Sequence, residues 1–254
     1  MTATDLERRR RPLVPDLEAF QNVKIVGLGG VGGIVARYLC LFLANASRSA
    51  ALTLIDGDTF EAGNASRAFF SCLGNKAAVV RDDLLDSAGE LPLTLTAIEE
   101  YVRPENLDRL IGEGDCVLLC VDNHATRRLV SEHCASLDDV CLISGGNDGV
   151  GEDASGRPQR GTYGNVQIHL RRGGRDESPA LTAHHPEIEH PADALPTDVS
   201  CTEAMLSMPQ ILFTNLATAS AMLNAFFLEA CGARGYAEVC FDVAEGLMAP
   251  VELA

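Results

Sequence analysis

The sequence predicts one α/β domain, built on a doubly wound, mainly parallel, Rossmann-like sheet with an antiparallel C-terminal extension. Short apolar strands alternate with helical segments through residues 23–145. The strands are apolar at successive positions, which is typical of parallel sheets buried on both faces. A glycine cluster, Gly27–Gly32, lies between the first strand and the first helix, where a tight turn is needed.

The elements of the first half follow from local patterns. Short apolar or β-branched runs predict strands at Val23–Val26, Leu52–Ile55, Leu93–Ile98, Cys116–Val121 and Val140–Ser144. Apolar residues at helical spacing predict helices at Gly32–Leu43, Gly74–Ser87, Pro104–Leu110 and Ala125–Leu137. Strands separated by helices of this length predict right-handed βαβ units.

The character of the sequence changes after Gly145. Thr162–Leu170 is expected to be an extended segment of antiparallel type, and Arg171–Ser200 is rich in Gly, Pro, acidic residues and His, which is typical of a mobile loop. Thr202–Cys231 predicts one or two buried helices, and Ala237–Val243 predicts a final strand.

Composition excludes several classes of function. The 20 basic and 36 acidic residues give a net charge of −16, so neither nucleic acid nor an anionic membrane is expected as a partner. The apolar stretches Ile25–Leu43 and Ile211–Cys231 contain charged or polar residues, and we interpret both as core elements. Nine cysteines without a regular framework, and an N-terminus without the apolar segment of a secretory signal, favour a cytoplasmic location.

The glycine cluster predicts a nucleotide site at Gly27, Gly29, Gly30 and Gly32. Glycine permits the tight turn and lets backbone N–H groups approach phosphate oxygens at a helix N-terminus. Asp56, at the end of the next strand, can accept hydrogen bonds from ribose hydroxyls. The alternative is a turn that serves only close packing of helix and strand.

A polar block after Asp56 favours a triphosphate over a nicotinamide dinucleotide. It contains Asp58, Asn64, Arg67 and Lys76. Displacement at phosphorus needs fixed donors and cations around the oxygens, which a cofactor bound at its pyrophosphate does not. Each side chain has a simpler alternative, as a solvated charge or a turn residue.

Asp122 follows a central strand, in the crevice where open α/β sheets bind ligands. One carboxylate together with phosphate oxygens can hold Mg²⁺ there. The alternative is a helix N-cap before Ala125.

These motifs together resemble the ThiF/MoeB-type adenylyltransferases, the family that includes the ubiquitin-activating enzymes. The resemblance rests on GLGGVG at Gly27–Gly32, on Asp56-Gly-Asp58 with Asn64 and Arg67, on the lysine of GNKA and on CVDN at Cys120–Asn123, and it covers residues 20–145 best. It implies that Asp56 binds the ribose of ATP, that Asn64, Arg67 and Lys76 contact phosphates, and that Asp122 holds Mg²⁺. The implied organisation is an arm at 1–22 and a single domain at 23–254, with a nucleotide-binding half at 23–145, a crossover loop at 171–200 and C-terminal helices and a strand at 201–254.

Cys201 is a second chemical candidate, between the polar loop and a helix. A thiol at a helix N-terminus can have a lowered pKa, and the resemblance implies that a cysteine followed by Thr takes the acyl group as a thioester. An inert cysteine is the alternative.

The chain also departs from the family pattern. It lacks the two CxxC pairs of many members, so structural zinc is not expected. A metal site in the loop is one interpretation of His184, His185, Glu187 and His190, but histidines in a polar loop are more often solvated, and we favour that interpretation.

The predicted function is therefore ATP-dependent adenylylation of the C-terminal glycine of a small ubiquitin-like or sulfur-carrier protein. Transfer to Cys201, a conjugating enzyme and a homodimer formed through the apolar helix Ile211–Leu228 are additional hypotheses. The competing functions are an NAD-dependent Rossmann oxidoreductase and a non-catalytic nucleotide-binding module. No catalytic acid–base set for hydride transfer is evident in the sequence.

Overall fold

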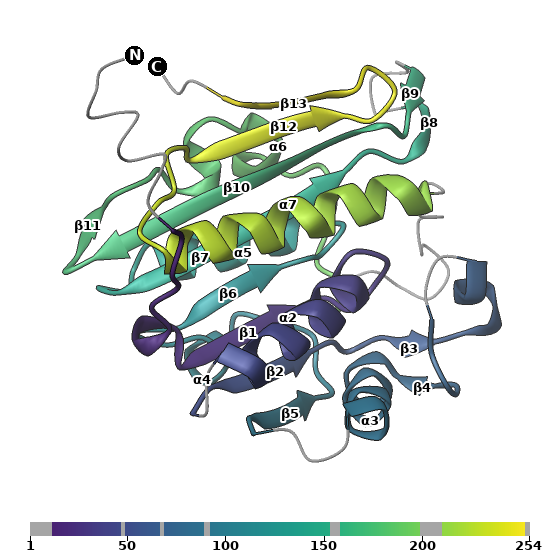
Figure 1. Cartoon of the computed structure of the whole chain (residues 1–254). Coiled ribbons are helices and arrows are strands. Elements are labelled where there is room, and N and C mark those ends of the chain that lie inside the picture. The colour runs from purple at the N-terminus through teal and green to yellow at the C-terminus, as the bar shows by residue number, and fades with distance from the viewer. Residues whose placement is uncertain are drawn as a thin grey trace.

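The computed structural model describes residues 12–46, 49–66, 69–88, 92–152, 158–198 and 210–251 (Figure 1). Within these ranges the chain forms a nine-stranded sheet, in the order β13-β12-β10-β7-β6-β1-β2-β5, with β11 beside β10. The parallel strands are β1 (Asn22–Val26), β2 (Ala51–Ile55), β5 (Thr94–Ile98), β6 (Cys116–Leu119) and β7 (Val140–Asn147). The antiparallel strands are β10 (Tyr163–Arg172), β11 (Arg175–Asp176), β12 (Glu238–Asp242) and β13 (Leu247–Pro250). This arrangement confirms the predicted fold class.

Helices cover both faces of the sheet. One face carries α2 (Gly32–Ala46), α3 (Lys76–Ala88) and α7 (Leu212–Ala230), which share one large apolar core with the strands. The other face carries α4 (Leu107–Leu110), α5 (His124–Cys134), the 3-10 turn η3 (Leu181–Ala183) and α6 (Pro186–Glu189) around a second core. None of the helices in the described ranges combines the length and hydrophobicity that crossing a bilayer requires.

Small elements complete the described chain. They are η1 (Glu18–Phe20), β3 (Thr59–Phe60), η2 (Ala62–Ser66), β4 (Gly74–Asn75), β8 (Val150–Glu152) and β9 (Pro158–Arg160). β3 pairs with β4, and β8 pairs with β9, in two separate hairpins outside the main sheet.

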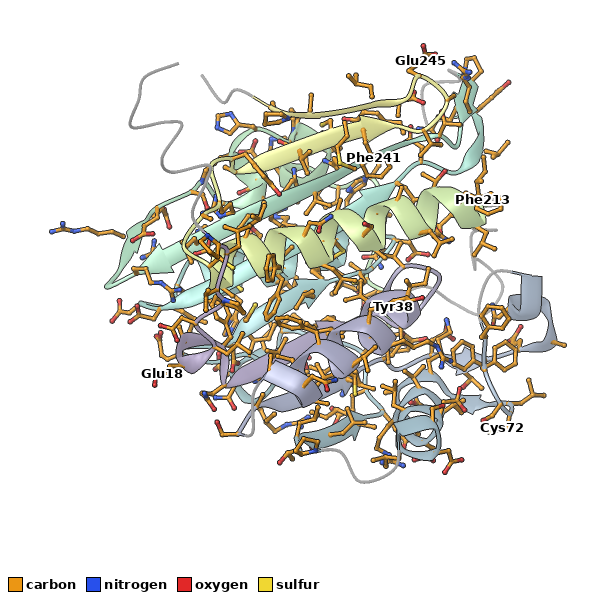
Figure 2. The ribbon with its side chains drawn as sticks, viewed as in Figure 1. Glu18, Tyr38, Cys72, Phe213, Phe241 and Glu245 are labelled. Carbon is orange, nitrogen blue, oxygen red and sulfur yellow. The ribbon has the colours of Figure 1, made fainter. Side chains whose placement is uncertain are left out.

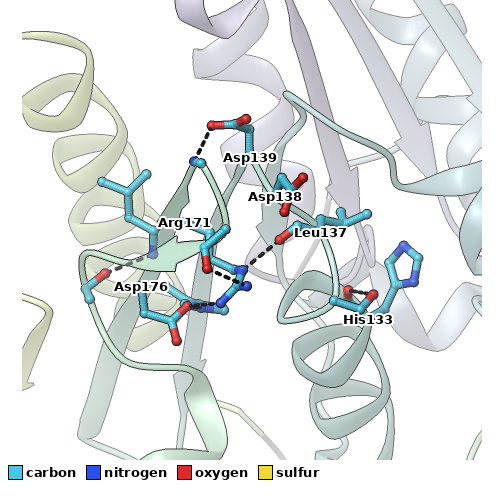
Figure 3. Close-up of polar contacts among 12 residues, drawn as sticks. His133, Leu137, Asp138, Asp139, Arg171 and Asp176 are labelled. Carbon is cyan, nitrogen blue, oxygen red and sulfur yellow. Dashed lines mark hydrogen bonds and ion pairs between the residues drawn. The ribbon is translucent and has the colours of Figure 1, made fainter.

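The carboxyl end of β10 is hydrogen-bonded to the connection between α5 and β7 (Figure 3). Arg171 Nε donates to the carbonyl oxygen of Leu137 at 2.6 Å, and its Nη1 pairs with Asp176 at 2.7 Å. The N–H of Gly173 donates to Asp139 at 3.1 Å. These bonds lie at the amino ends of β6 and β7, away from the carboxyl ends where parallel sheets bind ligands.

Three regions have more structure than the sequence predicted. The described part of the N-terminal arm, residues 12–21, packs against the domain, because Leu17 and Phe20 are buried in the larger core. The crossover region 171–200 is not a plain loop, since it contains α6 and buries Leu181 and Ile188. The C-terminal region has a second strand, β13, which continues the antiparallel edge.

Candidate functional site

A cavity of about 810 Å³ opens at the carboxyl ends of β1, β2, β6 and β7. Carboxyl ends of parallel strands are where open α/β sheets bind ligands. The sequence-predicted residues Gly27, Gly29, Asp56, Asp58, Lys76 and Asp122 all line it. The structure therefore brings together residues that lie almost a hundred positions apart in the chain.

The glycines between β1 and α2 have different structural roles. Gly27 adopts a φ of +87°, which favours glycine. A Cβ on Gly32 would lie 1.9 Å from the carbonyl oxygen of Gly27, and one on Gly30 would lie 2.3 Å from Asn215 Nδ2. A Cβ on Gly29 would meet nothing within 4 Å. Gly29 is thus the glycine whose missing side chain leaves space on the cavity side.

Asp56 is fixed at the end of β2 by two backbone donors. Its Oδ2 accepts from the N–H of Leu28 at 2.6 Å, and its Oδ1 accepts from the N–H of Asp58 at 2.8 Å. Burial raises the pKa of Asp56, and this effect exceeds the opposing effect of those hydrogen bonds. The glycine turn and the carboxylate therefore hold one another in place.

Lys76 begins α3 and lies on the cavity wall. Its Nζ forms an ion pair with the carboxylate of Asp58, and its N–H donates to the carbonyl oxygen of Asp58 at 2.9 Å. The side chain is only 12% exposed. Asn75 caps the same helix, because its Oδ1 accepts from the N–H of Ala77 at 2.8 Å. The ammonium group is thus held at the cavity by local structure.

Asp122 follows β6 and is exposed on the cavity. The helix N-cap is its neighbour Asn123, whose Oδ1 accepts from the N–H of Thr126 at 2.7 Å. The first N–H groups of α5, those of His124 and Ala125, donate to Asp193 at 2.8 Å each. Among the described residues the Asp122 carboxylate has no hydrogen bond or ion pair, so it is available to a cation.

Arg127 is a cavity residue that the sequence analysis missed. It is 7% exposed, and its guanidinium donates to Ser144 Oγ at 2.5 Å and to the carbonyl oxygens of Val121 and Gly145 at 2.6 and 2.7 Å. Burial lowers its pKa. The available signal was its position on the buried stripe of α5, three residues before Val130.

His185 is bound between two carboxylates, which corrects its interpretation as a solvated histidine. Its Nδ1 lies 2.8 Å from Glu187 Oε1, and its Nε2 lies 3.0 Å from Glu238 Oε2. Hydrogen bonding to Glu238 raises the pKa of His185 despite its burial. His185 therefore fastens α6 to β12. Within the described ranges, no group of three or more His, Cys, Asp and Glu residues is arranged to hold a metal ion.

The structure does not place three other sequence-predicted residues at the cavity. Asn64 is not among the described residues lining the cavity, and its Oδ1 accepts from the N–H of Glu61 at 2.8 Å, as a turn residue does. Arg67 and Cys201 lie outside the described residues.

The fold and the site define a Rossmann-like α/β protein, with its glycine turn and acidic strand ends gathered on one cavity. The model of the ThiF family matches residues 14–223. The chain therefore belongs to the ThiF family.

Two curated relatives match part of the chain. HesA of Leptolyngbya boryana is 28% identical over 145 residues, which are 53% of this chain and 50% of HesA. The protein named adenylyltransferase and sulfurtransferase uba4 of Emericella nidulans is 34% identical over 113 residues, which are 44% of this chain and 22% of uba4. The matched part is thus about half of HesA and a smaller part of uba4.

Solved structures match nearly the whole chain. E. coli MccB with ATP has a TM-score of 0.64 and 15% identity, over 92% of this chain and 64% of MccB. PaaA has a TM-score of 0.61 and 16% identity, over 99% of this chain and 74% of PaaA. At these identities the likeness shows the shared fold.

Proposed function

We propose that this protein is an ATP-dependent adenylyltransferase that activates the C-terminal carboxylate of a small protein. The observation that carries the proposal is the convergence of the glycine turn, Asp56, Lys76 and Asp122 on one cavity. The name of uba4 and the solved complex of MccB with ATP support it, as does a solved complex of MccB with MccA.

The residues have distinct roles in this reaction. Backbone N–H groups of the glycine turn bind phosphate oxygens, and Asp56 accepts hydrogen bonds from the ribose. Lys76, with Arg67, contacts the phosphates. The substrate carboxylate attacks the α-phosphorus, an acyl-adenylate forms and pyrophosphate leaves. Asp122 fits a ligand of Mg²⁺ because its carboxylate is exposed on the cavity. Mg²⁺ would neutralise the charge that develops on the phosphate oxygens.

The acyl group then passes to Cys201 in our proposal. The thiolate attacks the carbonyl carbon of the adenylate, a thioester forms and AMP leaves. Pro196 and Gln210, which lie on either side of Cys201 in the sequence, both line the cavity. That placement supports a route from adenylate to thiol.

The proposed partner is a ubiquitin-like or sulfur-carrier protein that ends in glycine, and a conjugating enzyme is the proposed acceptor of the thioester. A cytoplasmic location belongs to the same proposal.

A homodimer is also proposed, through the exposed face shared by α2 and α7. Tyr38 on α2 and Phe213 on α7 are 59% and 72% exposed on that face (Figure 2). Most of the remaining apolar surface of α7 is buried in the core.

An ATP–pyrophosphate exchange assay with candidate partners tests the function. We expect exchange that depends on a partner ending in glycine and that falls at least about a hundredfold in Lys76→Met, because phosphate contacts are charge-assisted. Arg81→Met is the matched control, since it removes the same charge from α3 outside the cavity. Exchange that survives in Lys76→Met would refute the assignment, and binding of NADH in preference to Mg-ATP would favour an oxidoreductase.

A further inference from the structure

The strand β10 presents a polar face to the cavity. Its apolar side chains, Val166, Ile168 and Leu170, are buried in the core that contains α7. The alternate side chains point to the opposite face of the sheet, because successive side chains of a strand alternate. They are Tyr163, Asn165, Gln167 and His169, and the first three line the cavity.

Gln167 stands in a row of polar side chains that crosses three strands. The register places it opposite Ser144 on β7 and opposite Glu238 on β12. Directly opposed residues of antiparallel strands share a face, so all three project to the same side.

The neighbours of Gln167 in this row already have partners. Ser144 Oγ accepts from the buried guanidinium of Arg127. Glu238 accepts from Asn165 Nδ2 at 3.0 Å and pairs with His185.

The amide N–H group of Gln167 itself has no acceptor among the described residues. Its side chain is 5% exposed, and its Nε2 is buried with no hydrogen-bond partner among the described residues. Leaving a buried amide donor unpaired is costly, so buried polar groups in native proteins are usually bonded. Gln167 is also one of the residues that line the cavity.

We propose that Gln167 Nε2 donates a hydrogen bond to a backbone carbonyl oxygen of the substrate tail that carries the reacting carboxylate. The inference rests on the proposed adenylylation and identifies the acyl substrate as a peptide tail. β7 alone separates β10 from β6, whose end carries Asp122. Two strand spacings are roughly 10 Å, a distance that about three extended residues span. A tail with its carboxylate near Asp122 therefore has peptide carbonyls within reach of Gln167.

The charges around Gln167 favour a neutral acceptor. His185 is held between Glu187 and Glu238, and the carbonyl oxygens and hydroxyl around Arg127 occupy its guanidinium. The row thus offers a neutral N–H, and none of the cations in the described part of the chain lies unpaired beside it. A peptide carbonyl matches this donor better than a phosphate or a second carboxylate.

Two non-reactive mimics of the acyl-adenylate test the inference by calorimetry. One is 5′-O-sulfamoyladenosine acylated with acetylglycylglycine, and the other carries an octanoyl group of the same backbone length without amides. Gln167→Met removes the donor at similar volume, and Gln167→Glu replaces it with an acceptor. Thermal unfolding and the Kd of Mg-ATP check that both variants keep the fold and the nucleotide site.

We expect Gln167→Met to weaken the peptidyl mimic about tenfold, Gln167→Glu to weaken it more, and both to leave the octanoyl mimic unchanged. Equal effects on the two mimics, or no effect on either, would overturn the inference, since Gln167 would then serve only the fold or a buried water. If neither acylated mimic binds wild-type protein more tightly than sulfamoyladenosine alone, the proposed adenylylation fails instead.

Discussion

Gly32 and Gly29 lie in the same turn, but we expect substitution of Gly32 to impair folding and substitution of Gly29 to impair ligand binding. In Gly32→Ala the new methyl carbon would lie 1.9 Å from a backbone carbonyl oxygen and 3.1 Å from the Cβ of Cys120. Neither neighbour is the end of a flexible side chain, so the turn itself must shift. Overpacking of this kind costs about 3 kcal/mol, which exceeds the helix propensity of about 1 kcal/mol that alanine gains over glycine.

The loss should appear as a lower melting temperature. For a chain of this size roughly 2–4 °C is lost per kcal/mol, so the net loss of about 2 kcal/mol should make Gly32→Ala melt about 4–8 °C below wild type in differential scanning calorimetry. Gly29→Ala meets no atom within 4 Å and should melt within about 2 °C of wild type. It should still weaken Mg-ATP binding by at least about tenfold, because the methyl group stands where backbone and phosphate approach closely. A stable Gly32→Ala, or a Gly29→Ala that binds Mg-ATP normally, would refute this division of roles.

Three further predictions concern the other face of the sheet. Arg127→Met leaves two buried carbonyl oxygens without a donor, and urea denaturation should show a free energy of unfolding lower by about 2–4 kcal/mol; an unchanged midpoint would contradict the reported contacts. Asp193→Ala removes the acceptor for the first N–H groups of α5, and the same measurement should show a loss of about 1–2 kcal/mol, with Asp198→Ala on the same segment as the control. His185→Gln should lower the stability of the protein most between about pH 4.5 and 6.5. Because the pKa of His185 is raised, its contribution to stability is lost as the pH rises through that pKa. Burial raises the pKa of Glu238, but hydrogen bonds from His185 and Asn165 outweigh burial and lower it, so the contribution of Glu238 to stability is lost in acid. Melting curves across pH check this, and a difference in melting temperature between variant and wild type that grows above pH 8 would have the wrong sign.

The parallel half of the fold was predictable because short apolar runs mark its strands, from the fully buried β6 to the partly exposed edge strand β5. β2 and β5 differ from their predicted bounds by one residue at one end, and β6 ends two residues earlier than the apolar run Cys116–Val121. Predicted helices were less accurate where tertiary contacts decide the outcome. Only the last turn of Pro104–Leu110 is helical, as α4, and the predicted Gly74–Ser87 divides into β4 and α3.

The candidate site was predictable where a residue follows a strand or glycine turn, and unpredictable where its place depends on distant partners. Asp56 and Asp122 sit at strand ends, so topology alone brings them to the cavity. The role of Arg127 depends on carbonyl oxygens at the ends of β6 and β7, and that of His185 depends on a carboxylate 53 positions away. Neither contact can be inferred from the local periodicity of the sequence.

Polar and apolar side chains alternate along β10. β6 and β10 are both buried strands, yet β6 is apolar at every position and β10 is apolar only at alternate ones. A sheet face covered by helices needs no polar side chains for folding, and each one adds a desolvation cost unless it is bonded. Asn165 is bonded, to Glu238, but Gln167 Nε2 is not. The proposed ligand, which accepts a hydrogen bond from Gln167 Nε2, would offset that desolvation cost.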